Sequence, residues 1–170
     1  MVPSAFLSST FAEFAEERRL LQEVVPLIDV HLICAERGGF LGLSLEETLK
    51  KWIDRSDMVI LLIGMRYGSE CKSGYSWTET EIRYAIDKGK RVFAYIRQID
   101  EDVERQTDAH KTQKRKLGNF IRMLETYVNI IPKYSYDEKW RLIAMVIRDI
   151  DRYARALEQK QMEESYVDGF

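Results

Sequence analysis

The chain has 170 residues, 45% of them hydrophobic and 32% charged, a composition typical of one soluble globular domain with a substantial core. Its 26 basic and 28 acidic residues leave a formal net charge of −2, so no general attraction to nucleic acid or acidic membranes is expected. The longest apolar run, Met58–Met65, is too short to span a bilayer, and the N-terminus shows no signal-peptide pattern. The two cysteines and two histidines lack metal-ligand spacing. The two cysteines are expected to be reduced thiols, which predicts a cytoplasmic protein.

The first predicted strand is the short apolar run Ser4–Ser9, and a helix is expected directly after it. The helical spacing of apolar residues starts at Phe11 and continues to a proline that ends or kinks the helix. Ser9 or Thr10 is the expected N-cap of this helix, with Glu13 at the capping-box position.

Two strands and one helix are predicted in the next part of the chain. Alternating residues predict a strand over Val30–Glu36, and the two glycines that follow predict a flexible loop. A helix comes next, with Ser44 and Glu47 in a capping box. The run 58–64 is continuously apolar and β-branched, which is typical of a parallel strand buried on both faces.

The second half of the chain repeats this alternation. A helix over 76–89, closed by its last glycine, leads into a strand over 90–97. The charged segment 98–116 is expected to form a surface loop or a frayed helix, followed by a helix over 117–127. A short or edge strand is expected over 128–134, because a proline interrupts it.

A long last helix is expected over 135–165. Its apolar residues recur at helical spacing, so we expect that stripe to lie in the core. The stripe consists of Trp140, Ile143, Ala144, Ile147, Ile150 and Ala154.

Strand and helix alternate five times along the chain. This pattern predicts an α/β fold, a three-layer sandwich in which a five-stranded parallel sheet has helices on both faces. We expect residues 1–170 to form a single domain.

Chemistry-bearing residues follow the first three predicted strands. Ligands of open parallel sheets bind beyond the carboxyl ends of the strands, so these loops should meet on one rim. Hydroxyls, guanidinium groups, aromatic rings and carboxylates together suit the phosphate, base and ribose of a nucleotide. The candidate residues are Ser8, Ser9, Thr10, Arg37, Arg66, Tyr67, Trp77, Glu79 and Glu81.

Neither a glycine-rich dinucleotide motif nor a P-loop accompanies these residues. Glu79 and Glu81 are also explained without a site, as solvated acids in a first helical turn. Their spacing of two places them on different faces of the helix, so they are not a paired-carboxylate site.

Three segments resemble one family, in the same order: FLSSTFAEFAEERRLL, IDRSDMVILLIGMRYGS and SWTETEIRYAIDKGKRVFAYI. The family is the Toll/interleukin-receptor-like (TIR-like) domain of unknown function, found at the N-terminus of larger NTPase-type defence or signalling proteins. The resemblance covers residues 1–100 and implies a TIR- or flavodoxin-like fold. It also implies a C-terminal NTPase or sensor region as a partner in a longer protein.

Residues 77–96 are more distantly similar to the segment of NAD-cleaving TIR domains that carries their catalytic glutamate. The similarity places Trp77 at the tryptophan position, Glu81 at the catalytic position, and Gly89–Lys90 at the turn before the next strand. Nucleoside deoxyribosyltransferases, which also break an N-glycosidic bond, are similar in the same segment. NAD is then a substrate rather than a cofactor, and the other rim residues would bind it.

Two functions therefore stand as hypotheses. The first is a TIR-like effector that hydrolyses the N-glycosidic bond of NAD through Glu81 and is activated by self-association into a homo-oligomer. The alternative is a non-enzymatic TIR-like module for protein–protein interaction or oligomerisation, in which Glu81 is only a helix-start acid. A third and weaker possibility is nucleoside or nucleotide processing without NAD.

Overall fold

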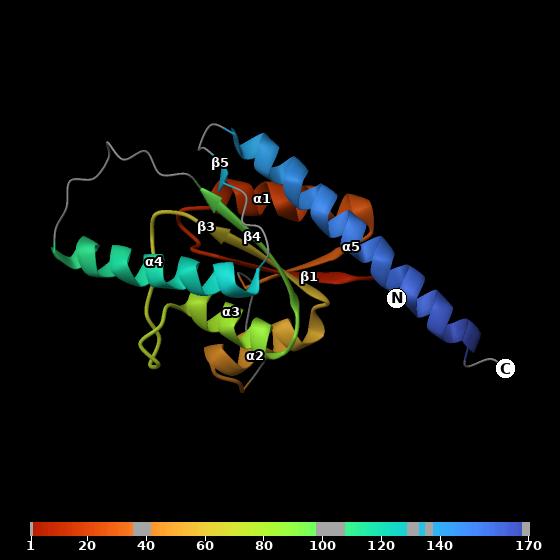
Figure 1. Ribbon diagram of the computed structural model, residues 1–170, viewed down its shortest axis with the longest axis horizontal. Helices are drawn as coiled ribbons and strands as arrows, with labels where there is room; N and C mark the ends of the chain where they lie inside the picture. Colours follow the sequence, from red (N-terminus) through yellow and green to blue (C-terminus); the bar gives the residue numbers. More distant parts are fainter. Residues whose placement is uncertain (1, 36–41, 98–107, 129–132, 135–137, 168–170) are drawn as a thin grey trace.

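The computed structural model describes residues 2–35, 42–97, 108–128, 133–134 and 138–167, and shows a parallel sheet between two layers of helices (Figure 1). The strands are β1 (Ser4–Ser9), β2 (His31–Cys34), β3 (Met58–Ile63), β4 (Arg91–Arg97) and β5 (Lys133–Tyr134). The helices are α1 (Ala15–Val24), the 3₁₀ turn η1 (Val25–Ile28), α2 (Leu45–Arg55), α3 (Trp77–Asp87), α4 (Asp108–Tyr127) and α5 (Lys139–Val167).

The strands lie in the order β2-β1-β3-β4-β5, and every neighbouring pair is parallel. The chain first adds β2 on one side of β1 and then places β3 on the other side, so the winding reverses between β1 and β3. The register sets Ser8 opposite Leu61 and Leu61 opposite Ala94. The carboxyl ends of β1, β3 and β4 therefore lie along the same edge of the sheet.

The predicted α/β sandwich with a parallel sheet is confirmed, but the described residues form four full strands instead of the five strands expected. Of the expected fifth strand, 128–134, residues 129–132 lie outside the described part of the chain. What is described of β5 is a two-residue segment that pairs with Ile96 and Arg97 at the end of β4. Two residues add little to a sheet, and the interrupting proline explains why this segment is a poor strand.

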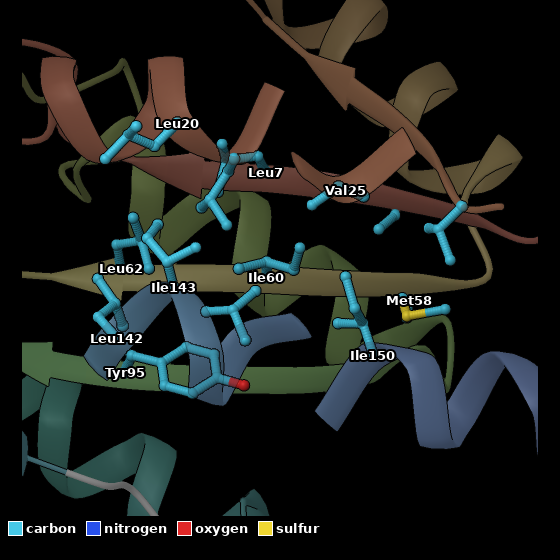
Figure 2. Close-up of a cluster of buried hydrophobic side chains, with 14 of the residues drawn as sticks. Leu7, Leu20, Val25, Met58, Ile60, Leu62, Tyr95, Leu142, Ile143 and Ile150 are labelled. Carbon is cyan, nitrogen blue, oxygen red and sulfur yellow. The ribbon is translucent and has the colours of Figure 1, made fainter. Parts of the chain in front are cut away.

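The residues of β3 alternate between two apolar cores, and all of them are buried. Those aligned with Ile60 pack with α1 and α5 on one face of the sheet, as Figure 2 shows. Those aligned with Leu61 pack with α2, α3 and α4 on the other face. Burial on both faces explains why the strand is apolar without interruption, as expected.

Capping side chains explain where α2 and α3 begin, and a glycine explains where α3 ends. Ser44 and Glu47 form the predicted capping box at α2. Ser76 caps α3 by accepting a hydrogen bond from the backbone N–H of Glu79, at 3.1 Å. Gly89 follows α3 with a left-handed φ of 66°, a conformation that glycine adopts at little cost and that lets the chain turn into β4.

The expectation for the first helix is wrong at its start. The helix α1 begins at Ala15 and has no side-chain cap, so Ser9 and Thr10 do not cap it. Phe11 lies in the turn before the helix and is 63% exposed, although it was expected on the apolar face. Apolar spacing indicates a helical face but does not tell at which turn the helix starts.

Two expectations for the last helices also change. Residues 108–116, expected in a loop or frayed helix, are part of α4, whereas 98–107 lie outside the described residues. Trp140 is 62% exposed, and Ala144 is exposed as well, so neither belongs to the core. The buried stripe of α5 runs instead through Leu142, Ile143, Val146, Ile150 and Ala154, which leaves Trp140 and Ala144 on its flank.

Candidate functional site

The candidate site lies at the carboxyl edge of the sheet, between the ends of β1 and β3. In a sheet wound in the order 2-1-3-4-5, ligands bind at the point where the winding reverses, which is between these two strands. The loops after β1 and β3 and the first turns of α3 meet there. Most of the candidate residues that the structure describes belong to these loops and turns.

Glu81 lies inside the protein, one turn into α3, and is 9% exposed. Its carboxylate accepts a hydrogen bond from the hydroxyl of Ser8, near the end of β1. Burial raises the pKa of Glu81 to about 7, while the Ser8 hydrogen bond and the charge of Arg18 act in the opposite direction. The explanation of Glu81 as a solvated helix-start acid is therefore wrong.

Arg18 supplies the positive charge near this carboxylate. It lies on α1, is 4% exposed, and donates a hydrogen bond to the hydroxyl of Ser9 at 2.7 Å. The neighbouring residues Ser8 and Ser9 thus connect β1 to two helices, one carrying Glu81 and the other carrying Arg18. A buried arginine beside a buried carboxyl favours the ionised form of that carboxyl.

Trp77 and Glu81 line the same small hollow between α2 and α3, which we call the α2–α3 hollow. Its volume is about 10 Å³, which is room for one water molecule at most and is too small for a ribose. Its other lining residues are Glu46, Leu49, Lys50, Ile53, Thr80 and Tyr84.

Glu79 belongs to a separate cluster, as its spacing from Glu81 predicted. Its carboxylate accepts hydrogen bonds from the Tyr67 hydroxyl at 2.6 Å and from Arg83 Nε at 2.8 Å. Tyr67 is 3% exposed, and burial together with the hydrogen bond to Glu79 raises its pKa to about 12. Tyr67 therefore lies in the interior beside Glu79 and not on the open rim.

The remaining rim residues meet at Glu13. The Thr10 hydroxyl donates to Glu13 Oε2 at 3.1 Å, and the backbone N–H of Arg66 donates to the same oxygen at 3.2 Å. The side chain of Arg66 is exposed. Arg37 lies outside the described residues.

Sequence reasoning did not single out Arg18, and it assigned Glu13 to a helix cap. A signal for Arg18 was present, because residues 17 and 18 fall between Phe14 and Leu21 on one face of α1, and both of these apolar residues are fully buried. No comparable signal exists for the backbone partners of Glu13, which lie 52 and 53 positions further along the chain.

Within the described part of the chain, no group of three or more His, Cys, Asp or Glu side chains could hold a metal ion. In the same residues, no helix is both long enough and apolar enough to cross a membrane. The edge of the sheet presents a buried carboxyl, hydroxyls, the guanidinium groups of Arg18 and Arg66, and an indole ring.

The sequence profile of the family described as "Domain of unknown function (DUF4062)" matches residues 4–151. The chain belongs to the DUF4062 family. The match extends well past residue 100, where the resemblance noted in the sequence ends, and reaches into α5. No curated protein matches the chain.

A solved structure supports the fold of this DUF4062 chain. The TIR domains of the activated Roq1 resistosome, which directly recognises the pathogen effector XopQ, superpose on it with a TM-score of 0.61. The similarity covers 87% of this chain and 99% of that one, at 15% sequence identity. The expected TIR-like fold is thereby confirmed, while identity at this level carries no statement about activity.

Proposed function

We propose that this DUF4062 domain is a TIR-like effector that hydrolyses the N-glycosidic bond of NAD, with Glu81 as the catalytic carboxylate. The observation that carries the proposal is a buried carboxyl with a raised pKa at the point where the sheet winding reverses, next to Trp77. Strongly perturbed carboxyls in such positions are typical of functional sites. The resemblance of residues 77–96 to NAD-cleaving TIR domains names the same glutamate.

The proposed reaction requires only a carboxylate near the ribose. When the bond between nicotinamide and C1′ of the ribose breaks, its electron pair leaves with nicotinamide, which departs neutral and needs no general acid. Positive charge develops on the ribose ring, and an ionised Glu81 would stabilise it from within a poorly hydrated site. Water then adds to C1′ and releases a proton, giving ADP-ribose.

Other residues take supporting roles in this proposal. Ser8 holds the Glu81 carboxyl in place, and Trp77 offers an indole face for stacking against a base. The exposed guanidinium of Arg66 is available to a phosphate, and Ser9, Thr10 and Arg37 remain proposed substrate contacts.

The α2–α3 hollow must enlarge before a ribose can reach Glu81, because it now holds one water molecule at most. We therefore propose that activity requires the separation of α2 from α3 and that self-association promotes it. The structural neighbour is a TIR domain of an activated resistosome, which motivates the link to assembly.

The test is a substrate panel of NAD, NADP and nucleosides, incubated with concentrated protein and analysed by mass spectrometry. We expect wild type to release nicotinamide and ADP-ribose from NAD and the Glu81→Gln variant, which keeps the shape of the side chain, to be at least about 100-fold slower. Glu23→Gln, a matched change on the exposed face of α1, should behave as wild type. Equal product from wild type and Glu81→Gln would remove the enzymatic proposal.

The small volume of the α2–α3 hollow favours a second candidate, the interaction module. In that case the Ser8–Glu81 hydrogen bond only connects β1 to α3, and the domain acts by assembling with copies of itself or with partners. Its signature would be signalling that is lost through surface changes on the helices and is retained in Glu81→Ala at unchanged stability.

A further inference from the structure

The carboxylate of Glu13 lies on the backbone at the end of β3. Its Oε1 accepts a hydrogen bond from the N–H of Met65 at 2.6 Å, and its Oε2 accepts one from the N–H of Arg66 at 3.2 Å. The hydroxyl of Thr10 donates to Oε2 as well, at 3.1 Å. Successive backbone N–H groups that converge on one anion form an anion-binding nest, and we call these two amides the β3 nest.

Gly64, the residue before the β3 nest, leaves the space that the carboxylate occupies. A Cβ atom at Gly64 would lie 2.1 Å from Glu13 Oε1 and 2.6 Å from Oε2. Such contacts are far inside van der Waals distance, so only glycine permits an anion to come this close to the backbone. The local sequence and the fold together leave room for negative charge at this point.

The position of the β3 nest is that of a ligand site. It lies at the carboxyl end of β3, next to the end of β1, where the winding of the sheet reverses. Ligands of sheets wound in this order bind in this crevice, and phosphates bind backbone N–H groups. Arg66, which contributes one N–H group of the nest, also carries an exposed guanidinium group.

We infer that the β3 nest is the subsite for the diphosphate of the nucleotide substrate and that Glu13 occupies it as a competing internal anion until nucleotide binds. This inference rests on the proposed function, because it supposes that the domain takes a nucleotide with a diphosphate. A diphosphate oxygen would replace the Glu13 carboxylate on the amides of Met65 and Arg66. Glu13 would then turn toward solvent, which its partly exposed position allows.

The first experiment measures binding of inorganic pyrophosphate and ADP-ribose by calorimetry. Glu13→Gln removes the competing charge and keeps the shape, so we expect both ligands to bind about tenfold more tightly than to wild type. Glu16→Gln is the matched control, since it removes the same charge from the exposed first turn of α1, and its affinities should stay within about twofold. Ribose, which has no phosphate, should bind all three proteins equally.

Addition of Gly64→Ala to Glu13→Gln should abolish the gain, because the new methyl group occupies the place of the anion. Equal pyrophosphate affinity in Glu13→Gln and Glu16→Gln, with both proteins folded by circular dichroism, would overturn the inference.

A second measurement uses wild-type protein and does not depend on how any variant folds. In an NMR titration with pyrophosphate, the backbone amides of Met65 and Arg66 should shift more than those at the opposite edge of the sheet, such as Met58. Saturating pyrophosphate that leaves both amides unmoved would also overturn the inference. Neither experiment requires NAD cleavage, so an inactive protein whose β3 nest binds pyrophosphate would refute the proposed reaction and retain the subsite.

Discussion

Glu81 is held between opposing influences on its pKa. Burial favours the neutral acid, whereas the hydroxyl of Ser8 and the charge of Arg18 favour the carboxylate. The result is a pKa of about 7 instead of 4.5, so Glu81 is partly ionised near neutral pH. The proposed reaction requires this ionised form. The same balance couples the charge of the site to the stability of the fold.

The free energy of unfolding should fall as the pH rises from about 5 to about 8. In this range the native protein keeps a proton on Glu81 that the unfolded chain, with a pKa near 4.5, has already released, so the native state is progressively disfavoured. The loss should total on the order of 3 kcal/mol once the pH is well above 7. Urea unfolding at several pH values measures it, and NAD cleavage, which needs the ionised form, should rise over the same range.

Glu81→Gln provides the control for this pH dependence. The amide does not titrate, so the fall should be absent in this variant, and at pH 8 the variant should be more stable than wild type. Parallel stability profiles for the two proteins would show that Glu81 has an ordinary pKa.

In Ser8→Ala, the rise of NAD cleavage with pH should occur about one pH unit higher than in wild type. The hydroxyl stabilises the charged form of Glu81, so its removal leaves burial less opposed and raises the pKa further. Ser4→Ala, at the other end of β1, removes hydroxyl contacts to Asp57 and the Arg55 carbonyl and should cost stability without changing the profile. The same pH dependence of NAD cleavage in Ser8→Ala and wild type would mean that Ser8 does not affect the pKa of Glu81.

Residues of α2 and α3 enclose the hollow that Glu81 lines, and hydrogen bonds connect the two helices at one end. At the carboxyl end of α2, the hydroxyl of Tyr84 donates to Asp54 at 2.9 Å, and Lys90 donates to the carbonyls of Asp54 and Ser56. The amino end of α2 reaches the hollow through Glu46. In the proposed separation of α2 from α3, these hydrogen bonds would hold the carboxyl end of α2 in place.

Tyr84→Phe should loosen this connection without leaving a cavity. We expect a loss of about 1 kcal/mol in unfolding free energy and faster hydrogen exchange in α2, because one hydrogen bond between the two helices is gone. If opening limits access, NAD cleavage per molecule should rise. Tyr153→Phe, on α5 and on the other face of the sheet, is the matched control and should leave exchange in α2 unchanged. Unaltered exchange in Tyr84→Phe would place the hinge elsewhere.

The whole molecule resembles a TIR domain in fold, and its net charge of −2 is too small to oppose contact between copies. The proposed activation by assembly involves more than one molecule, since the hollow in a single molecule is too small for substrate.

Specific activity should therefore increase with protein concentration. A fusion of the chain to a coiled-coil dimerisation tag should raise NAD cleavage at low concentration by about tenfold or more, because the second contact becomes intramolecular. The same fusion carrying Glu81→Gln should stay inactive. Specific activity that is constant from dilute to concentrated protein, with and without the tag, would exclude activation by assembly.

The sequence alone predicted most of the fold, because local patterns report local structure. The apolar run of β3, the capping box at Ser44 and the turn at Gly89 each depend on neighbouring residues and were found correctly. Phe11 and Trp140 were misplaced, because periodicity identifies a face of a helix but not the extent of the surface that covers it.

For the candidate site, too, the sequence predicted the local features and not the contacts between distant segments. Residue types and spacing named Trp77 and Glu81, and placed Glu79 on another face, since three residues of one helix have a fixed relative geometry. Glu81 is buried and hydrogen-bonded to Ser8, which lies 73 positions earlier, and Glu13 accepts hydrogen bonds from the amides of a distant strand end. Hydrogen bonds and burial between segments far apart in the chain leave no local pattern, so only the tertiary structure decided the charge, the partners and the accessibility of the site.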